Sequence, residues 1–173
     1  MMQIIRLATL TLALAACQDQ PVRSTAPTPP PPQQGVAAFI TVDRLDAPVG
    51  ATVRVRVEVQ VGTEQGYKLG SFTGRLHFAA DKLQFQAENP INDGLRVSNP
   101  AKAASGEIRF AGASAAGFAT LVLYDGAFVV KAADYASGLT LQMEEMSAAK
   151  TLTNLRSQLN VSRQIFLSRT AEH

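Results

Sequence analysis

The side chains best suited to metal or nucleophilic chemistry are scarce in this sequence. Its 173 residues include one cysteine, Cys17, and two histidines, His77 and His173. A zinc site takes three or four closely grouped nitrogen, sulfur or carboxylate ligands. Cys17 follows an apolar run near the start, His77 falls within an expected strand, and His173 is the last residue. The pattern therefore predicts neither a metal site nor a cofactor.

Three other short patterns resemble parts of catalytic or cation sites. Glu144 and Glu145 are adjacent acids, but neighbours on a strand point to opposite faces, which argues against a paired-carboxylate mechanism. Ser114 lies between glycines without the spacing of a nucleophile elbow. Asn92-Asp93-Gly94 supplies only part of a calcium loop and is more typical of a turn. The sequence therefore predicts a protein that is not an enzyme.

The chemistry of Cys17 follows from what precedes it. Arg6 is the single charge in front of an apolar run over residues 7–14, and two alanines lead into the cysteine. This order is typical of a secretory signal peptide, and the apolar run is too short to span a bilayer. Leu14-Ala-Ala-Cys17 also resembles the lipobox of bacterial lipoproteins. The resemblance implies cleavage before Cys17 and acylation of its thiol and its new amino group.

The lipobox resemblance also predicts a location. In Gram-negative lipoproteins an Asp directly after the cysteine tends to retain the protein in the inner membrane, and here Gln18 holds that position. The expected location is the bacterial cell envelope, with the chain anchored in the outer membrane through acylated Cys17. Each methylene group buried in the bilayer contributes about 0.8 kcal/mol to the free energy of membrane binding. One acyl chain therefore binds a protein to the membrane weakly, and several bind it firmly.

The chain divides into four expected regions. Residues 1–16 form the signal peptide, and residues 17–35 form the lipidated cysteine and a tether that contains Pro29 to Pro32. The tether is poor in large apolar residues, so it cannot fold by itself, and in an extended polyproline conformation it reaches roughly 50 Å. Residues 36–168 are long enough to build one core, and residues 169–173 form a tail.

The charge balance excludes one class of partner. The sequence has 16 Lys and Arg against 14 Asp and Glu, and loss of Arg6 with the signal peptide leaves the chain near neutral. A nucleic-acid partner usually requires a basic stripe, so none is expected.

From residue 36 onward the hydrophobic pattern has the period of a β-strand. In Val53–Val61 five valines alternate with polar residues, which predicts a half-buried antiparallel strand whose Arg56 and Glu58 lie close enough to pair. Similar runs recur between Gly-, Pro- and Asn-rich turns, which predicts an all-β sandwich. The expected core comprises Val55, Val57, Val59, Phe72, Leu76, Phe78, Phe85, Ile108, Phe110, Leu123 and Phe128.

One segment has a different period. Met146, Ala149, Leu152, Leu155 and Leu159 are spaced as on a helix, so a helix is one alternative for this segment. We favour a loop, followed by a last strand near residues 160–168.

Several motifs resemble the cohesin family. Residues 50–57 resemble its opening G-x-x-V-x-V-x-V, residues 69–85 its G-x-F-x-x-x-L-x-Y/F-D-P-x-x-L, and residues 106–113 its G-x-I-x-x-A-G, while residues 126–131 resemble a strand near its end. The match covers roughly residues 37–167 and implies an antiparallel jelly-roll β-sandwich of about nine strands. One departure is Ala79-Ala80, where the family usually has Asp-Pro.

The cohesin resemblance implies a non-catalytic module that binds a protein, either dockerin-like or another envelope partner. In cohesins the partner contacts include the strand that corresponds to residues 71–78, whose outward residues here are Ser71, Thr73, Arg75 and His77. Arg75 offers a donor fork to carboxylates or carbonyls, and His77 can titrate near neutral pH. Two alternatives are open, a purely structural envelope lipoprotein and a polysaccharide-binding module. The absence of Trp and the scatter of three tyrosines count against polysaccharide binding.

Overall fold

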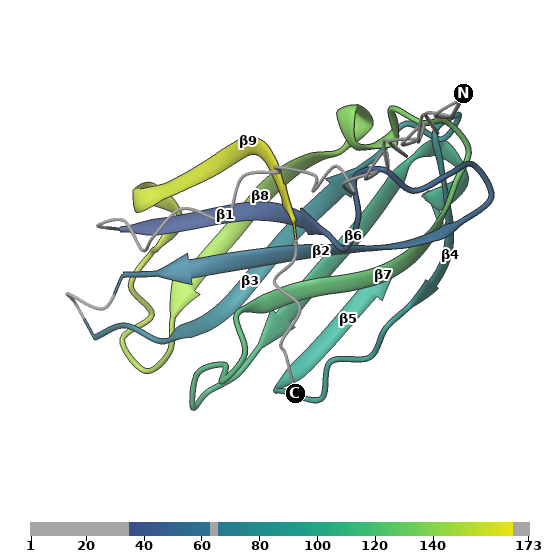
Figure 1. Ribbon diagram of the computed structural model, residues 1–173. Coiled ribbons are helices and arrows are strands. Elements are labelled where there is room, and N and C mark those ends of the chain that lie inside the picture. Colours follow the sequence, from purple (N-terminus) through teal and green to yellow (C-terminus); the bar gives the residue numbers. More distant parts are fainter. Residues whose placement is uncertain (1–34, 63–65, 168–173) are drawn as a thin grey trace, which may run out of the picture.

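The computed structural model describes residues 35–62 and 66–167, so the predicted signal peptide, the acylation site and the C-terminal tail lie outside the described residues. Within them, nine strands form two sheets packed face to face, with strand orders β4-β7-β2-β1-β9 and β5-β6-β3-β8 (Figure 1). The all-β sandwich predicted from the sequence is confirmed. Its strands are β1 (Val36–Val42), β2 (Thr52–Val61), β3 (Leu69–His77), β4 (Leu83–Glu88), β5 (Leu95–Asn99), β6 (Glu107–Ala113), β7 (Val122–Val130), β8 (Thr140–Ala148) and β9 (Leu159–Leu167).

The alternating valines place β2 at the centre of the five-stranded sheet. Val53, Val55 and Val57 are fully buried against the opposite sheet, and the polar residues between them face outward. β2 pairs antiparallel with both β1 and β7. A strand with one apolar and one polar face is stable here because only one side of the sheet is covered.

One strand pair departs from the antiparallel arrangement. β9 pairs with β1 in parallel, with Val36 opposite Leu159 and Val42 opposite Leu167. All other paired strands among the described residues are antiparallel. The parallel pair arises because the last strand crosses from the four-stranded sheet and joins the edge of the other sheet beside the first strand.

The predicted core residues lie between the two sheets, and all are buried except Phe85. Phe85 is partly buried because β4 is an edge strand, and its ring still packs 5.6 Å from that of Phe128. Gly74 makes room for an aromatic neighbour, since a Cβ at this position would lie 2.6 Å from Cζ of Phe110.

The segment with helical spacing is a strand end, a turn and a short 3-10 helix. Met146 is buried in β8, and Leu155 is buried just before the 3-10 helix Arg156–Gln158. The Leu155 N–H donates to the carbonyl of Met146 at 2.9 Å, so the turn between them returns the chain to β8 and both side chains are buried. The favoured loop and last strand are therefore confirmed, and the helical alternative is wrong.

Candidate functional site

The four residues singled out on residues 71–78 lie in one row on the outer face of β3. Ser71, Thr73, Arg75 and His77 are each half-exposed, and the intervening Phe72 and Leu76 are buried. β3 runs between β6 and β8, so the row crosses the middle of the four-stranded sheet. The structure thus gives these side chains the outward orientation that the alternation predicts.

A β-bulge in β8 changes the arrangement of the adjacent acids. Thr73 pairs with Glu145 and Gly74 pairs with Met143, so Glu144 is an extra residue opposite this step. Met143 and Met146 point into the core, while Glu144 contacts β3 on the outer face and Glu145 is exposed beside Thr73. The expectation that the two glutamates face opposite sides is wrong, because the bulge interrupts the alternation.

Glu144 and Arg75 form the centre of an ion-pair network. Arg75 Nε donates to Glu144 Oε1 at 2.7 Å, and Arg75 Nη1 lies 3.5 Å from Glu107 Oε2. Arg109 Nη2 on β6 lies 3.3 Å from the second oxygen of Glu144. The hydrogen bond from Arg75 lowers the pKa of Glu144, and the same bond raises the pKa of Arg75. The donor fork of Arg75 is thus held in a fixed orientation on the face.

Two further basic groups approach Glu107 at the end of this network. His77 Nδ1 lies 3.9 Å from Glu107 Oε2, and Lys102 Nζ lies 3.9 Å from Glu107 Oε1. His77 attracts the carboxylate only in its protonated form. This end of the outer face therefore presents alternating charges, which favours partners with matching polar groups.

The other end of the face is apolar. On β5, Leu95 is 73% exposed and Val97 is 62% exposed. They pair with Ala113 and Ala111 of β6, so four apolar side chains lie together on the outer side. A shallow depression beside them is lined by Thr73, Val97, Asn99, Arg109 and Ala111. Sequence reasoning missed this apolar strip, although the alternation Leu95-Arg-Val97 between Gly94 and Pro100 is its signal.

Arg96 explains why Leu95 and Val97 point outward. Its side chain is 9% exposed and turns inward, where the guanidinium lies 4.4 Å from the Phe118 ring centroid and donates to the Val122 carbonyl at 2.7 Å. Burial lowers the pKa of Arg96, and Asp93 opposes that effect. A slip by one residue would expose Arg96 and bury its neighbours, so these contacts fix the register of β5.

Asp93, the acid in the sequence that resembles part of a calcium loop, lies near Arg96 and binds backbone N–H groups of the loop before β7. Its Oδ2 accepts from the N–H groups of Ala119 and Thr120 at 2.9 and 2.8 Å. The turn interpretation of residues 92–94 therefore holds, since this oxygen organises the loop before β7.

The outer face of the five-stranded sheet carries a second polar cluster. Asp125 on β7 is 3% exposed, and it accepts hydrogen bonds from Arg54 and Arg56 and from Asn89. Glu58 instead accepts from Thr41 at 2.6 Å. The predicted proximity of Arg56 and Glu58 therefore does not produce their ion pair, because Asp125 on the neighbouring strand holds Arg56.

Two absences concern the described part of the chain. Within residues 35–62 and 66–167, no three or more His, Cys, Asp and Glu side chains are grouped to hold a metal ion. In the same residues no helix has the length and apolarity needed to cross a membrane.

Comparison with known proteins identifies the class of fold. No family model and no curated protein sequence matches this chain. Among solved structures, the second type II cohesin module of the cellulosomal adaptor scaffoldin ScaA of Acetivibrio cellulolyticus matches with a TM-score of 0.54 at 12% identity, over 79% of this chain and 98% of that one.

Two further cohesins give similar values. The non-cellulosomal cohesin of the archaeon Archaeoglobus fulgidus matches with a TM-score of 0.53 at 16% identity, over 79% of this chain and 94% of that one. The type I cohesin in the Coh-OlpC–Doc435 complex of Clostridium thermocellum matches with a TM-score of 0.55 at 12% identity, over 81% of this chain and 99% of that one. The likeness shows that the described domain has the cohesin-like jelly-roll fold, as the sequence motifs predict.

Proposed function

We propose that this chain is a lipid-anchored, non-catalytic module that binds a protein through the outer face of its four-stranded sheet. The observation that carries the proposal is the composition of that face. Exposed Leu95 and Val97 lie on the same face as the ion-pair network of Arg75 and Glu144. Protein interfaces combine an apolar centre with polar groups around it. Single exposed apolar side chains are common on free surfaces, whereas neighbouring ones such as these are typical of interaction sites.

The charged half of the face supplies orientation and specificity. Glu144 and Glu107 already hold the Arg75 side chain in one orientation. A partner that binds Arg75 therefore costs little further side-chain conformational entropy. Ser71 and Ser147 share a hydrogen bond on the same face and offer further polar contacts. The candidate contact residues are thus Ser71, Thr73, Arg75 and His77, extended by the apolar strip of β5 and β6.

The cohesin fold suggests the class of the partner. The Clostridium thermocellum cohesin, and the sixth cohesin of scaffoldin B of Acetivibrio cellulolyticus, were each solved in complex with a dockerin. A dockerin-like protein is therefore the first partner to test, and another envelope protein is the second. The Ala79-Ala80 departure from the family motif lies beyond the end of β3, outside the row of candidate contact residues.

Affinity capture from the envelope and secretome of the source organism tests the binding proposal. The intact domain should capture a specific protein, and Arg75→Ala and His77→Ala should weaken that capture. Saturable binding to a polysaccharide, with no protein captured, would favour the carbohydrate alternative. That alternative has little support on this face, because the outward side chains of its four described strands include no Phe, Tyr or Trp.

The anchor is the second part of the proposal, and it rests on the lipobox resemblance at Cys17. Acylation of Cys17 and transfer to the outer membrane would display the domain at the end of its proline-rich tether. Cys17→Ser should abolish lipid labelling and leave the signal peptide uncleaved. A native protein whose mature N-terminus lies elsewhere and carries no acyl group, as measured by mass spectrometry, would overturn this part.

A further inference from the structure

One pole of the sandwich receives the chain from the tether. β1 begins there, and the Gly62 N–H donates to the Gly35 carbonyl at 2.8 Å, which fixes the entry point beside the end of β2. We call this the entry pole; its described loops are residues 66–68, 114–121 and 149–158. The charged side chains described in these loops are Lys68, Lys150 and Arg156, and all three are positive.

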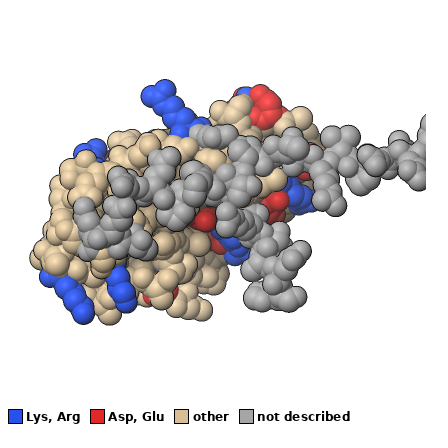
Figure 2. All heavy atoms as spheres, turned by 60° about the vertical axis from the view of Figure 1, so that its left-hand side comes forward, with Lys and Arg blue, Asp and Glu red and all other residues tan. Residues whose placement is uncertain are grey.

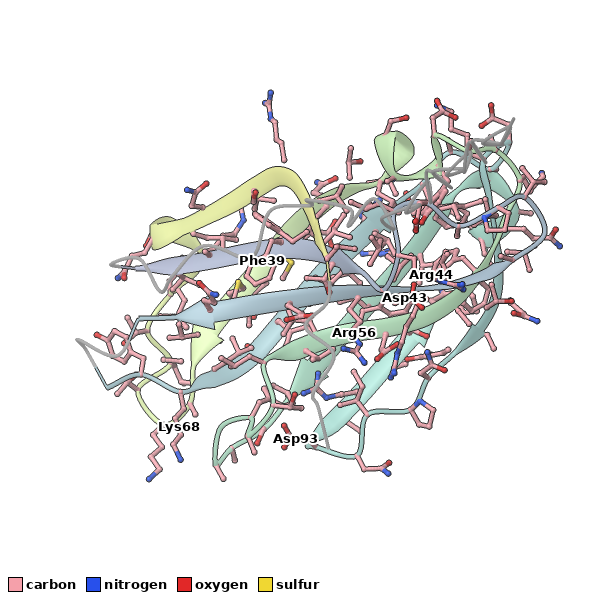
Figure 3. All side chains as sticks on the ribbon, in the orientation of Figure 1. Phe39, Asp43, Arg44, Arg56, Lys68 and Asp93 are labelled. Carbon is pink, nitrogen blue, oxygen red and sulfur yellow. The ribbon has the colours of Figure 1, made fainter. Side chains whose placement is uncertain are left out.

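The opposite pole has a different charge pattern. Its loops, residues 43–51, 78–82, 100–106 and 131–139, carry acids and bases in equal number. Figure 3 shows Lys68 projecting away from the strands at the end opposite to Asp43 and Arg44. Figure 2, turned so that the left-hand side of Figure 1 comes forward, shows Lys and Arg side chains projecting from this side of the molecule, with some Asp and Glu side chains also in view. Asp93, the acid that precedes β5 near the entry pole, is engaged by Arg96.

Two lysines of the entry pole flank a pocket. Lys68 and Lys150 line it together with Tyr67, Ala116 and Thr151. The Ala149 N–H donates to the Lys68 carbonyl at 2.8 Å, so the two lysines emerge from adjoining chain segments. Both are exposed, and within the described residues neither has an ion pair. Two unneutralised ammonium groups at one hollow attract anionic groups.

The same turn presents an apolar side chain to solvent. Leu152 is 78% exposed, and both Lys150 and Leu152 adopt left-handed backbone conformations, with φ of 64° and 54°. Non-glycine residues rarely adopt this conformation. The turn is held by the Leu152 N–H to the Ala148 carbonyl at 3.1 Å and the Ala148 N–H to the Thr153 carbonyl at 2.9 Å. These hydrogen bonds hold the backbone of the turn with Leu152 exposed, two residues from Lys150.

We propose that the entry pole docks on the anionic headgroup surface of the bilayer that holds the acylated chain; this inference rests on the lipid anchor proposed above. Leucine, tyrosine and lysine together are the side chains that proteins place at a membrane interface. Each lysine near an anionic surface adds a modest attraction, and the tether keeps the pole at a high effective concentration, so weak contacts suffice. The docked strands stand upright on the membrane, and the outer face of the four-stranded sheet stays open to a partner from the side.

A single introduced cysteine can report this docking, because the chain's one native cysteine is the acylated one. Ala115→Cys places an environment-sensitive fluorophore on an exposed turn of the entry pole, and Ala101→Cys places the same probe on an exposed turn of the opposite pole. The lipidated protein is reconstituted into vesicles of phosphatidylcholine mixed with phosphatidylglycerol, and into vesicles of phosphatidylcholine alone. We expect a blue shift, with quenching by brominated lipid, for position 115 in the anionic vesicles only.

Charge variants complete the test. Lys68→Gln with Lys150→Asn, in which Asn tolerates the left-handed backbone, should weaken docking about tenfold. Lys102→Gln with Lys131→Gln removes the same charge from the opposite pole and should leave the signal unchanged. An aqueous spectrum at position 115 in anionic vesicles, or equal shifts at both positions, overturns the docking but not the anchor. Failure of the protein to incorporate into any vesicle overturns the anchor, and the docking falls with it.

Discussion

Glu144 occupies the extra position of the bulge in β8, and from there its carboxylate accepts the Arg75 Nε hydrogen at 2.7 Å across to β3. In a regular strand Met143 would face the core, Glu144 would face outward and Glu145 would face the core again. The bulge instead keeps both glutamates outside and both flanking methionines inside. One irregularity in the ladder therefore builds the charged half of the candidate binding face.

The Arg75–Glu144 bond should be visible in the titration of the carboxylate. Because that bond lowers the pKa of Glu144 below its ordinary value of 4.5, Arg75→Ala should raise it, as measured by NMR titration of the side-chain carboxyl carbon. Arg109→Ala should raise it less, because the Arg109 bond is longer and contributes less. The stability from this bond is present above the ordinary pKa and is lost as the pH falls through the lowered one. An unchanged pKa in Arg75→Ala would contradict the network.

The apolar strip should contribute to partner binding without contributing to the fold. Val97→Asp places a charge where a valine side chain is 62% exposed, so it should weaken partner capture at least tenfold while the melting temperature changes little. Val49→Asp is the matched control, since Val49 is 65% exposed in the loop between β1 and β2. Equal capture of the partner by the two variants would show that the apolar strip does not contribute to the interface.

The carboxylate of Asp125 should be essential to stability. Asp125→Ala removes the buried carboxylate that accepts hydrogen bonds from Arg54 and Arg56, and since both arginines are partly exposed we expect a loss of about 2–3 kcal/mol in the free energy of unfolding by urea. Asp134→Ala is the control. It removes a largely exposed carboxylate that pairs with Lys82, so it should leave the midpoint of urea unfolding nearly unchanged. Similar midpoints for the two variants would contradict the burial of Asp125.

Two buried tyrosines should respond oppositely to loss of the hydroxyl. The Tyr124 hydroxyl has no hydrogen-bond partner among the described residues, so Tyr124→Phe should be neutral or stabilise the domain by up to about 1 kcal/mol. The Tyr135 hydroxyl donates to the Arg44 carbonyl, so Tyr135→Phe should cost about 1 kcal/mol. Burial raises the pKa of Tyr135 to about 12, so its phenol stays protonated as a donor near neutral pH. Chemical denaturation of both variants gives the comparison, and a destabilised Tyr124→Phe would reveal an unseen partner.

The sequence by itself determined the features that depend on neighbours along the chain. The alternating valines of β2 set its buried and exposed sides, because side chains on a strand alternate with a period of two residues. The same rule placed Ser71, Thr73, Arg75 and His77 on one outward row of β3. The lipobox resemblance at Cys17 is also local, and it stays a prediction because Cys17 lies outside the described residues.

Only the tertiary structure decided the features that depend on contacts between distant residues. Arg96 turns inward because Phe118 and the Val122 carbonyl receive its guanidinium, and this exposes Leu95 and Val97. Glu144 faces Arg75 because pairing between β3 and β8 shifts by one residue. β9 joins β1 in parallel because the chain crosses between the sheets. Local periodicity states which residues share a face of a strand, whereas the partners of that face are set by long-range pairing and burial, which no short stretch of sequence contains.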